Sequence, residues 1–159
     1  MQHIPNRNNN RLFAVCIPLI TVAFLFFALA KVLPYAGILQ GVGGIFCVVF
    51  LFLTIRYALS AYRYVIDGDS LLVYRRQGKR EEALCSISLT SILFLYTKEE
   101  FKKASPSHAL RYNFCQNFGA KNAVFLLFVF DDVIDKRAVI SFEASAEMLA
   151  CLKQYEKEA

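Results

Sequence analysis

The chain has 159 residues, of which 57% are apolar, and a formal net charge of +5. Soluble domains are usually about 45–50% apolar, so this surplus predicts segments that avoid water. All 13 acidic residues follow residue 59, whereas Arg7, Arg11, Lys31 and Arg56 are the only basic residues before it. The chain from residue 60 onward is therefore nearly neutral, which argues against nucleic-acid binding.

The five cysteines are Cys16, Cys47, Cys85, Cys115 and Cys151. They form no Cys-x-x-Cys pair, have no clustered histidine and are odd in number. This pattern predicts reduced structural thiols rather than a metal site or a disulfide framework. We expect no metal and no cofactor.

After a tail at residues 1–11, two apolar segments predict a transmembrane hairpin over residues 12–58. Residues 12–33 carry Lys31 as their single charge, and residues 37–55 carry none. Each segment is long enough to cross about 30 Å of hydrocarbon as a helix. Only residues 34–36 separate them, so the two helices should be antiparallel neighbours.

The flanking charges predict the orientation of this hairpin. Arg7, Arg11 and Arg56 flank it on one side and Lys31 lies on the other, so the positive-inside rule places both termini in the cytoplasm of a plasma-membrane protein. Ala28-Leu29-Ala30 also matches the small-residue site of a cleaved signal peptide, but cleavage there would leave the second apolar segment in place. A buried hairpin of a soluble protein is the remaining alternative.

Gly37 and Gly41 have the Gly-x-x-x-Gly spacing that allows membrane helices to approach closely. We expect them to pack within the hairpin. A homo-oligomer formed through the same face is the alternative.

The period of the apolar pattern changes in residues 60–159, which predict a separate cytoplasmic domain. Seven β-prone runs are separated by turn-forming residues. They cover residues 62–66, 71–76, 81–88, 92–96, 110–118, 122–130 and 136–142. Residues 97–109 predict an exposed loop or a short helix, and residues 145–157 predict an amphipathic C-terminal helix with Ser145 as its N-cap.

Seven antiparallel strands followed by one helix indicate an α+β membrane protein whose domain is a bent sheet or partly open barrel. The segments that carry a family resemblance are YRYVIDGDSLLVYRR, LTSILFLY and ISFEASAEMLACLKQY. They resemble bacterial pleckstrin-homology-like domains, which often follow paired membrane helices, over about residues 60–157. The resemblance implies a binding or scaffolding module, and by itself no particular ligand.

The densest basic group consists of Arg75, Arg76, Lys79 and Arg80. These residues are candidates for contact with anionic lipid headgroups. A solvated turn balanced by Glu81 and Glu82 is the alternative. Phosphoinositide-binding relatives of the fold carry basic residues in the first hairpin loop, where this chain has Asp67-Gly68-Asp69-Ser70, so phosphoinositide recognition is not expected.

Catalytic chemistry is not predicted. Asp131, Asp132 and Asp135 lack the spacing of a calcium loop and are expected to form a turn. His108 and His3 are far in sequence from any nucleophile arrangement. We therefore expect a protein that is not an enzyme.

Three functions remain as hypotheses. The first is a membrane-anchored, cytoplasm-facing protein-interaction or scaffolding module, whose predicted strand at residues 110–118 could accept a partner's strand. The second is a lipid-associating or envelope-stress accessory protein on the inner leaflet. The third is a subunit of a membrane transporter or enzyme complex that packs through Gly41 and its neighbours.

Overall fold

The computed structural model describes residues 1–131 and 136–156 and divides into two compact units. One unit is Asn8–Ser60 and is helical. The other unit combines Met1–Arg7 with the chain from Ala61 onward and contains the sheets.

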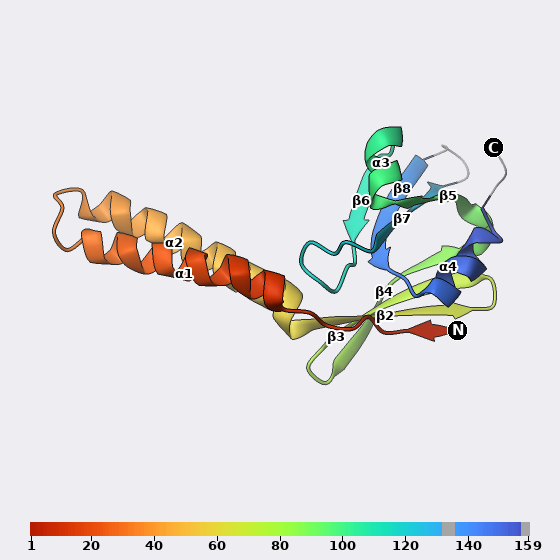
Figure 1. Ribbon diagram of the computed structural model, residues 1–159, viewed down its shortest axis with the longest axis horizontal. Helices are drawn as coiled ribbons and strands as arrows, with labels where there is room; N and C mark the ends of the chain where they lie inside the picture. The colour runs from red at the N-terminus through yellow and green to blue at the C-terminus, as the bar shows by residue number, and fades with distance from the viewer. Residues whose placement is uncertain (132–135, 157–159) are drawn as a thin grey trace. The chain divides into compact units, whose positions relative to one another are not determined.

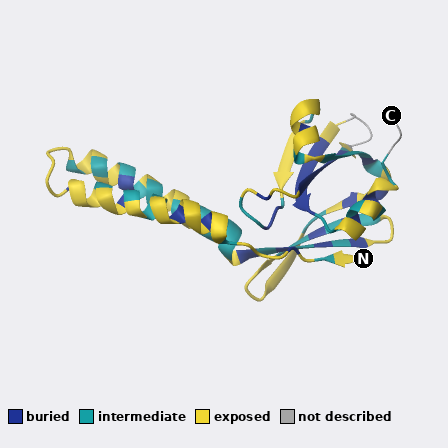
Figure 2. Ribbon diagram, viewed as in Figure 1, coloured by how far each residue is buried: buried dark blue, intermediate teal, exposed yellow. Residues whose placement is uncertain are grey.

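The helical unit consists of α1 (Asn10–Leu29) and α2 (Ala36–Leu53), which lie side by side and antiparallel (Figure 1). A π-helical segment, Thr54–Leu59, extends α2, so that Ala36–Leu59 is 24 residues long. Both helices are long and apolar enough to cross a membrane. Their large apolar side chains, such as Phe24, Ile38 and Phe52, are mostly exposed (Figure 2), as expected for helices surrounded by lipid rather than by a protein core.

The connection between the helices is longer than residues 34–36, because α1 ends at Leu29 instead of residue 33. Lys31 and Val32 donate backbone hydrogen bonds to residues three positions earlier, which tightens the last turn. Pro34 then disfavours a helical conformation at the residue before it.

The glycine contact between α1 and α2 is at Gly43, not at Gly37 or Gly41 as predicted. A Cβ atom on Gly43 would lie 3.2 Å from the carbonyl oxygen of Ala23 and 3.2 Å from the Phe27 ring. A Cβ atom on Gly37 or Gly41 would meet nothing within 4 Å. The prediction failed because spacing reveals which glycines share a face of α2 but not which face meets α1.

In the part of the chain that the structure describes, the second unit has two four-stranded sheets, which corrects the expected single set of seven strands. The first sheet has the order β1-β2-β3-β4, with β1 at Gln2–His3, β2 at Ser60–Asp67, β3 at Ser70–Gln77 and β4 at Arg80–Ser88. The second has the order β5-β7-β8-β6, with β5 at Ile92–Thr97, β7 at Ala123–Asp131, β8 at Lys136–Glu143 and β6 at Leu110–Asn113. Gly68 and Gly78 have positive φ angles at the two tight turns of the first sheet.

The additional strand comes from residues that we expected to form a tail. Gln2 and His3 pair with Val65 and Tyr64 as the antiparallel strand β1. Ile66 also donates a backbone hydrogen bond to the Met1 carbonyl. A two-residue strand has no periodicity of its own, so only its distant partner β2 reveals it.

The expected strand at residues 110–118 is also different. β6 ends at Asn113 and pairs with β8 in parallel, so the strands are not all antiparallel. The side chain of Asn113 accepts a hydrogen bond from the Cys115 backbone, a local turn that diverts the chain from the sheet. Because β6 and β8 are parallel, a tight turn cannot connect them. After β6 the chain passes to the other side of β8, where it forms β7, and then returns as β8.

One hydrophobic core joins both sheets to the C-terminal helix α4 (Ala146–Lys153), and a second cluster includes Phe101, Phe125 and Val139. The fully buried members of the first core include Tyr64 and Leu71 from the first sheet and Phe142 from the second. Met148 and Leu152 of α4 complete this core.

The short helix α3 (Lys98–Ala104) lies within the segment expected to be a loop or a short helix. The turn predicted at Asp131, Asp132 and Asp135 lies outside the described residues or side chains. The helix predicted over residues 145–157 is shorter, because α4 ends at Lys153 and the next two residues form a turn.

Candidate functional site

The predicted basic residues lie on one hairpin but in different surroundings. Arg75 and Arg76 are in β3, whereas Lys79 and Arg80 are in the turn and at the start of β4. Arg75 forms an ion pair of 3.0 Å with Glu82, its neighbour across the strands. Arg76, Lys79 and Arg80 are exposed at the tip.

The carboxylate of Glu81 also has a specific partner, because its Oε1 lies 2.8 Å from Nε of Arg63. The two glutamates expected to balance the turn are therefore paired with Arg63 and Arg75. Both pairs are partly exposed, so each contributes little to stability. The hairpin tip, with Arg76, Lys79 and Arg80 exposed, therefore remains positively charged.

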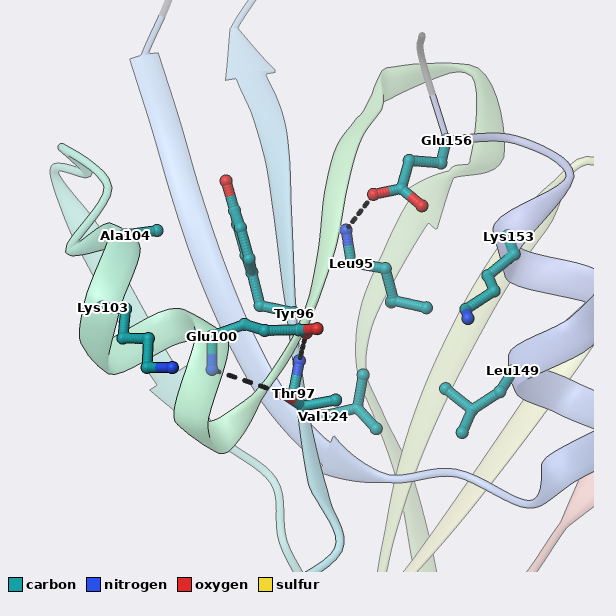
Figure 3. A pocket seen from close by; sticks show the side chains of 10 residues that line it. All are labelled: Leu95, Tyr96, Thr97, Glu100, Lys103, Ala104, Val124, Leu149, Lys153 and Glu156. Atoms are coloured by element: carbon teal, nitrogen blue, oxygen red, sulfur yellow. Dashed lines mark hydrogen bonds between the residues drawn. The ribbon is translucent and has the colours of Figure 1, made fainter. Parts of the chain in front are cut away.

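A groove that sequence reasoning missed lies beside β5 and has a volume of about 720 Å³. We call it the β5 groove. Figure 3 shows α3 on one wall and α4 on the other, with β5 between them. Its lining residues are Leu95, Tyr96, Thr97, Glu100, Lys103, Ala104, Val124, Leu149, Lys153 and Glu156.

The base of the β5 groove is a sheet edge. β5 pairs with β7 on one side only, since it is the first strand of its sheet. The backbone N–H groups of Leu95 and Thr97 point away from β7, because both donate to carboxylates outside the sheet. Residues two apart in a strand place such groups about 7 Å apart on the same edge. This is the donor spacing that an added strand would use.

Two glutamates occupy these backbone donors. Leu95 N–H donates to Oε1 of Glu156 at 3.1 Å, and Thr97 N–H donates to Oε2 of Glu100 at 2.8 Å (Figure 3). The second bond belongs to a capping box, in which Thr97 Oγ1 accepts from the Glu100 backbone N–H. Charged acceptors at an edge strand prevent uncontrolled pairing with other chains.

The groove also contains two positive charges, Lys103 from α3 and Lys153 from α4. The pKa of Glu100 is lowered, mainly by the hydrogen bond from the Thr97 backbone N–H and next by the Thr97 hydroxyl. The positive charges of Lys153 and Lys103 also lower this pKa. Burial, followed by the nearby charge of Glu156, raises the pKa of Tyr96. The two negative charges of the groove, on Glu100 and Glu156, equal the two positive charges on its lysines. Its apolar surface comes from Leu95, Val124 and Leu149.

A smaller apolar pocket of about 200 Å³ lies between β4 and the second sheet, where Cys85, Phe114 and Phe128 contribute to its lining. Burial raises the pKa of the Cys85 thiol to about 11, which makes it a poor nucleophile.

In residues 1–131 and 136–156, no three His, Cys, Asp or Glu side chains lie together as metal ligands.

One local pattern in the sequence marks part of the β5 groove. Thr97 followed three residues later by Glu100 is the pattern of a capping box, and it indicates the start of α3. Nothing local associates Glu156 with Leu95, because 61 residues separate them. β6, which contains part of the strand expected to accept a partner, lies at the opposite edge of the same sheet.

Comparison with known protein families, with curated proteins and with solved structures finds no match for this chain.

Proposed function

We propose that this chain is a membrane-anchored, cytoplasm-facing protein-interaction or scaffolding module with no catalytic role, whose β5 groove binds a partner protein. The observation that carries the proposal is the edge of β5, where Leu95 and Thr97 present backbone donors between the walls formed by α3 and α4. A strand edge beside an apolar surface is a general means of binding an extended peptide.

The proposed anchor is the hairpin of α1 and α2, which has the required length and composition. Met1–Arg7 belongs to the same unit as the chain after Ala61, and β1 is paired with β2. The segments before α1 and after the π-helical segment would therefore lie on the same side of the bilayer. Arg7, Arg11 and Arg56 flank the hairpin on that side, which favours the cytoplasm.

We further propose that the β-rich unit has a pleckstrin-homology-like fold. Its support is the pair of four-stranded sheets and the C-terminal helix that packs Met148 and Leu152 into their shared core. Such a scaffold would hold the edge of β5 rigidly between α3 and α4, which form the walls of the binding surface.

Site-specific photocrosslinking in living cells tests this function. The photoreactive residue p-benzoylphenylalanine replaces Ala104, which is exposed and lines the β5 groove, or Ala83, which is exposed on β4. The proposal predicts a protein adduct of defined mass at Ala104 that is absent at Ala83. Equal adducts at both positions, or none at Ala104, would contradict it.

A second candidate function is association of the β3–β4 hairpin with anionic lipid, which is favoured by the exposed Arg76, Lys79 and Arg80 at its tip. The test is hydrogen exchange of residues 76–81 in the full chain, in nanodiscs of phosphatidylglycerol or phosphatidylcholine. Association predicts slower exchange in phosphatidylglycerol, and reversal of the three charges should remove the difference. Identical exchange in both lipids would exclude this function.

A further inference from the structure

The β5 groove already holds a carboxylate at the position where a ligand would bind. We infer that it binds an acidic, extended peptide segment of a partner, and that Glu156 is an internal stand-in that this segment displaces. The inference rests on the proposed function and specifies the chemistry of the partner.

The contact that Glu156 makes is suited to displacement. Its Oε1 accepts one hydrogen bond, from Leu95 N–H at 3.1 Å, and the residue follows the last turn of α4. Withdrawal of this side chain would expose a donor on the edge of β5. An incoming strand can replace it with a backbone carbonyl, whereas the Thr97 N–H keeps its bond to Oε2 of Glu100.

The charges in the β5 groove determine which segment fits. With Glu156 in place, Glu100 and Glu156 balance Lys103 and Lys153. Once Glu156 leaves, the two lysines on opposite walls outnumber Glu100 (Figure 3). A carboxylate carried by the ligand restores the balance, whereas a basic ligand would increase the excess of positive charge.

The apolar residues favour a peptide over a lipid headgroup. Leu95, Val124 and Leu149 line the groove between its charged residues. A strand that alternates acidic and apolar residues places its apolar side chains on one face, toward these residues. A headgroup phosphate would satisfy the lysines but would leave the strand edge unpaired.

The test uses the full chain in phosphatidylcholine nanodiscs and two fluorescein-labelled probes. One probe is a capped hexapeptide of alternating glutamate and valine, and the other alternates lysine and valine. Binding is measured by fluorescence anisotropy for the wild type and for Glu156→Ala. The matched control is Glu147→Ala, which removes an exposed glutamate from α4 outside the groove.

The inference predicts that Glu156→Ala binds the glutamate probe about tenfold tighter than the wild type, because the competing charged acceptor is gone. Glu147→Ala should bind like the wild type, and the lysine probe should gain nothing. Adding Lys153→Glu to Glu156→Ala should abolish the gain, whereas adding Lys102→Glu, on α3 outside the groove, should not. If Glu156→Ala does not fold, Glu156→Gln keeps the side chain's length and should show a smaller gain with the same preference.

Three results would overturn the inference. The first is no gain for the glutamate probe, and the second is an equal gain for the lysine probe. The third is loss of probe binding in phosphatidylglycerol nanodiscs, which would assign the groove to a lipid headgroup. An adduct at Ala104 in the crosslinking experiment, together with either of the first two results, would retain the interaction function and reject only the acidic ligand.

Discussion

The carboxylate of Glu143 accepts two hydrogen bonds of 2.7 Å from Asn117, one from its backbone N–H and one from its side-chain amide. Glu143 is only 3% exposed, so water cannot replace either bond. The Asn117 amide also donates to the Asn6 carbonyl at 2.9 Å. This pair therefore connects β8, the segment after β6 and the N-terminal segment of the same unit.

We predict that Glu143→Ala lowers the free energy of unfolding by about 2 kcal/mol, because two partly buried donors lose a charged acceptor. Glu147→Ala, at an exposed position on α4, should change it by less than about 0.5 kcal/mol. Urea unfolding of the detergent-solubilised chain, followed by near-ultraviolet circular dichroism of its tyrosines, measures both. Similar losses for the two variants would show that the pair contributes no specific stability.

In the helical hairpin of α1 and α2, Gly43→Leu should lower the unfolding temperature of the two helices. The new side chain would be too close to the Ala23 carbonyl and the Phe27 ring. Gly41→Leu is the matched control, since the space around Gly41 is open. Thermal unfolding in detergent, followed by far-ultraviolet circular dichroism, measures the unfolding temperature of both variants. The packing would be refuted by a larger decrease for Gly41→Leu than for Gly43→Leu.

Alkylation of Cys85 should be slow in the folded chain. Its pKa is raised to about 11, so at pH 8 the reactive thiolate is roughly 100-fold rarer than in the unfolded chain. Iodoacetamide labelling at pH 8, followed by mass spectrometry of the Cys85 peptide with and without denaturant, measures the ratio. Equal labelling rates would mean that the thiol is not buried as described.

The capping box should make α3 sensitive to acid. The pKa of Glu100 is lowered, so its stabilising contribution is present at pH above its ordinary value near 4.5 and is lost as the pH falls through the lowered value. Hydrogen exchange of residues 98–104, corrected for the intrinsic rate, should therefore accelerate more at pH 3 than exchange of β7. Glu100→Gln should remove most of this pH dependence, and Glu99→Gln should keep it.

Removing the N-cap of the same helix gives a separate prediction. Thr97→Ala should destabilise α3 by about 1 kcal/mol, because the Glu100 backbone N–H loses its acceptor. Thr90→Ala, outside the box, is the control. Exchange of residues 98–104 at pH 7 measures the effect, and an unchanged rate in Thr97→Ala would contradict it.

Local patterns predicted the features that depend on neighbouring residues. Apolar runs indicated α1 and α2, and the pattern after Ser145 indicated α4 with its buried Met148 and Leu152. The features that were missed depend on distant partners. β1 exists because Gln2 and His3 meet β2, and β6 is parallel because the chain passes around β8.

The same distinction applies to the candidate sites. Arg75, Arg76, Lys79 and Arg80 were visible as a cluster, but the partners of Glu81 and Glu82 were not. The spacing of Thr97 and Glu100 is that of a capping box, but the prediction for residues 97–109 did not use it. The β5 groove also needs the end of α4 to bring Glu156 to Leu95. Sequence spacing could not supply that contact.

The central claim is that a partner segment pairs with the edge of β5 in place of Glu156. Hydrogen exchange at residues 92–97 tests it directly, in the nanodisc-embedded Glu156→Ala chain with and without the glutamate–valine probe. The account predicts faster exchange of Leu95 in the variant alone and strong protection when the probe is added, with residues 82–87 of β4 unaffected. Binding of the probe without protection of residues 92–97 would contradict it.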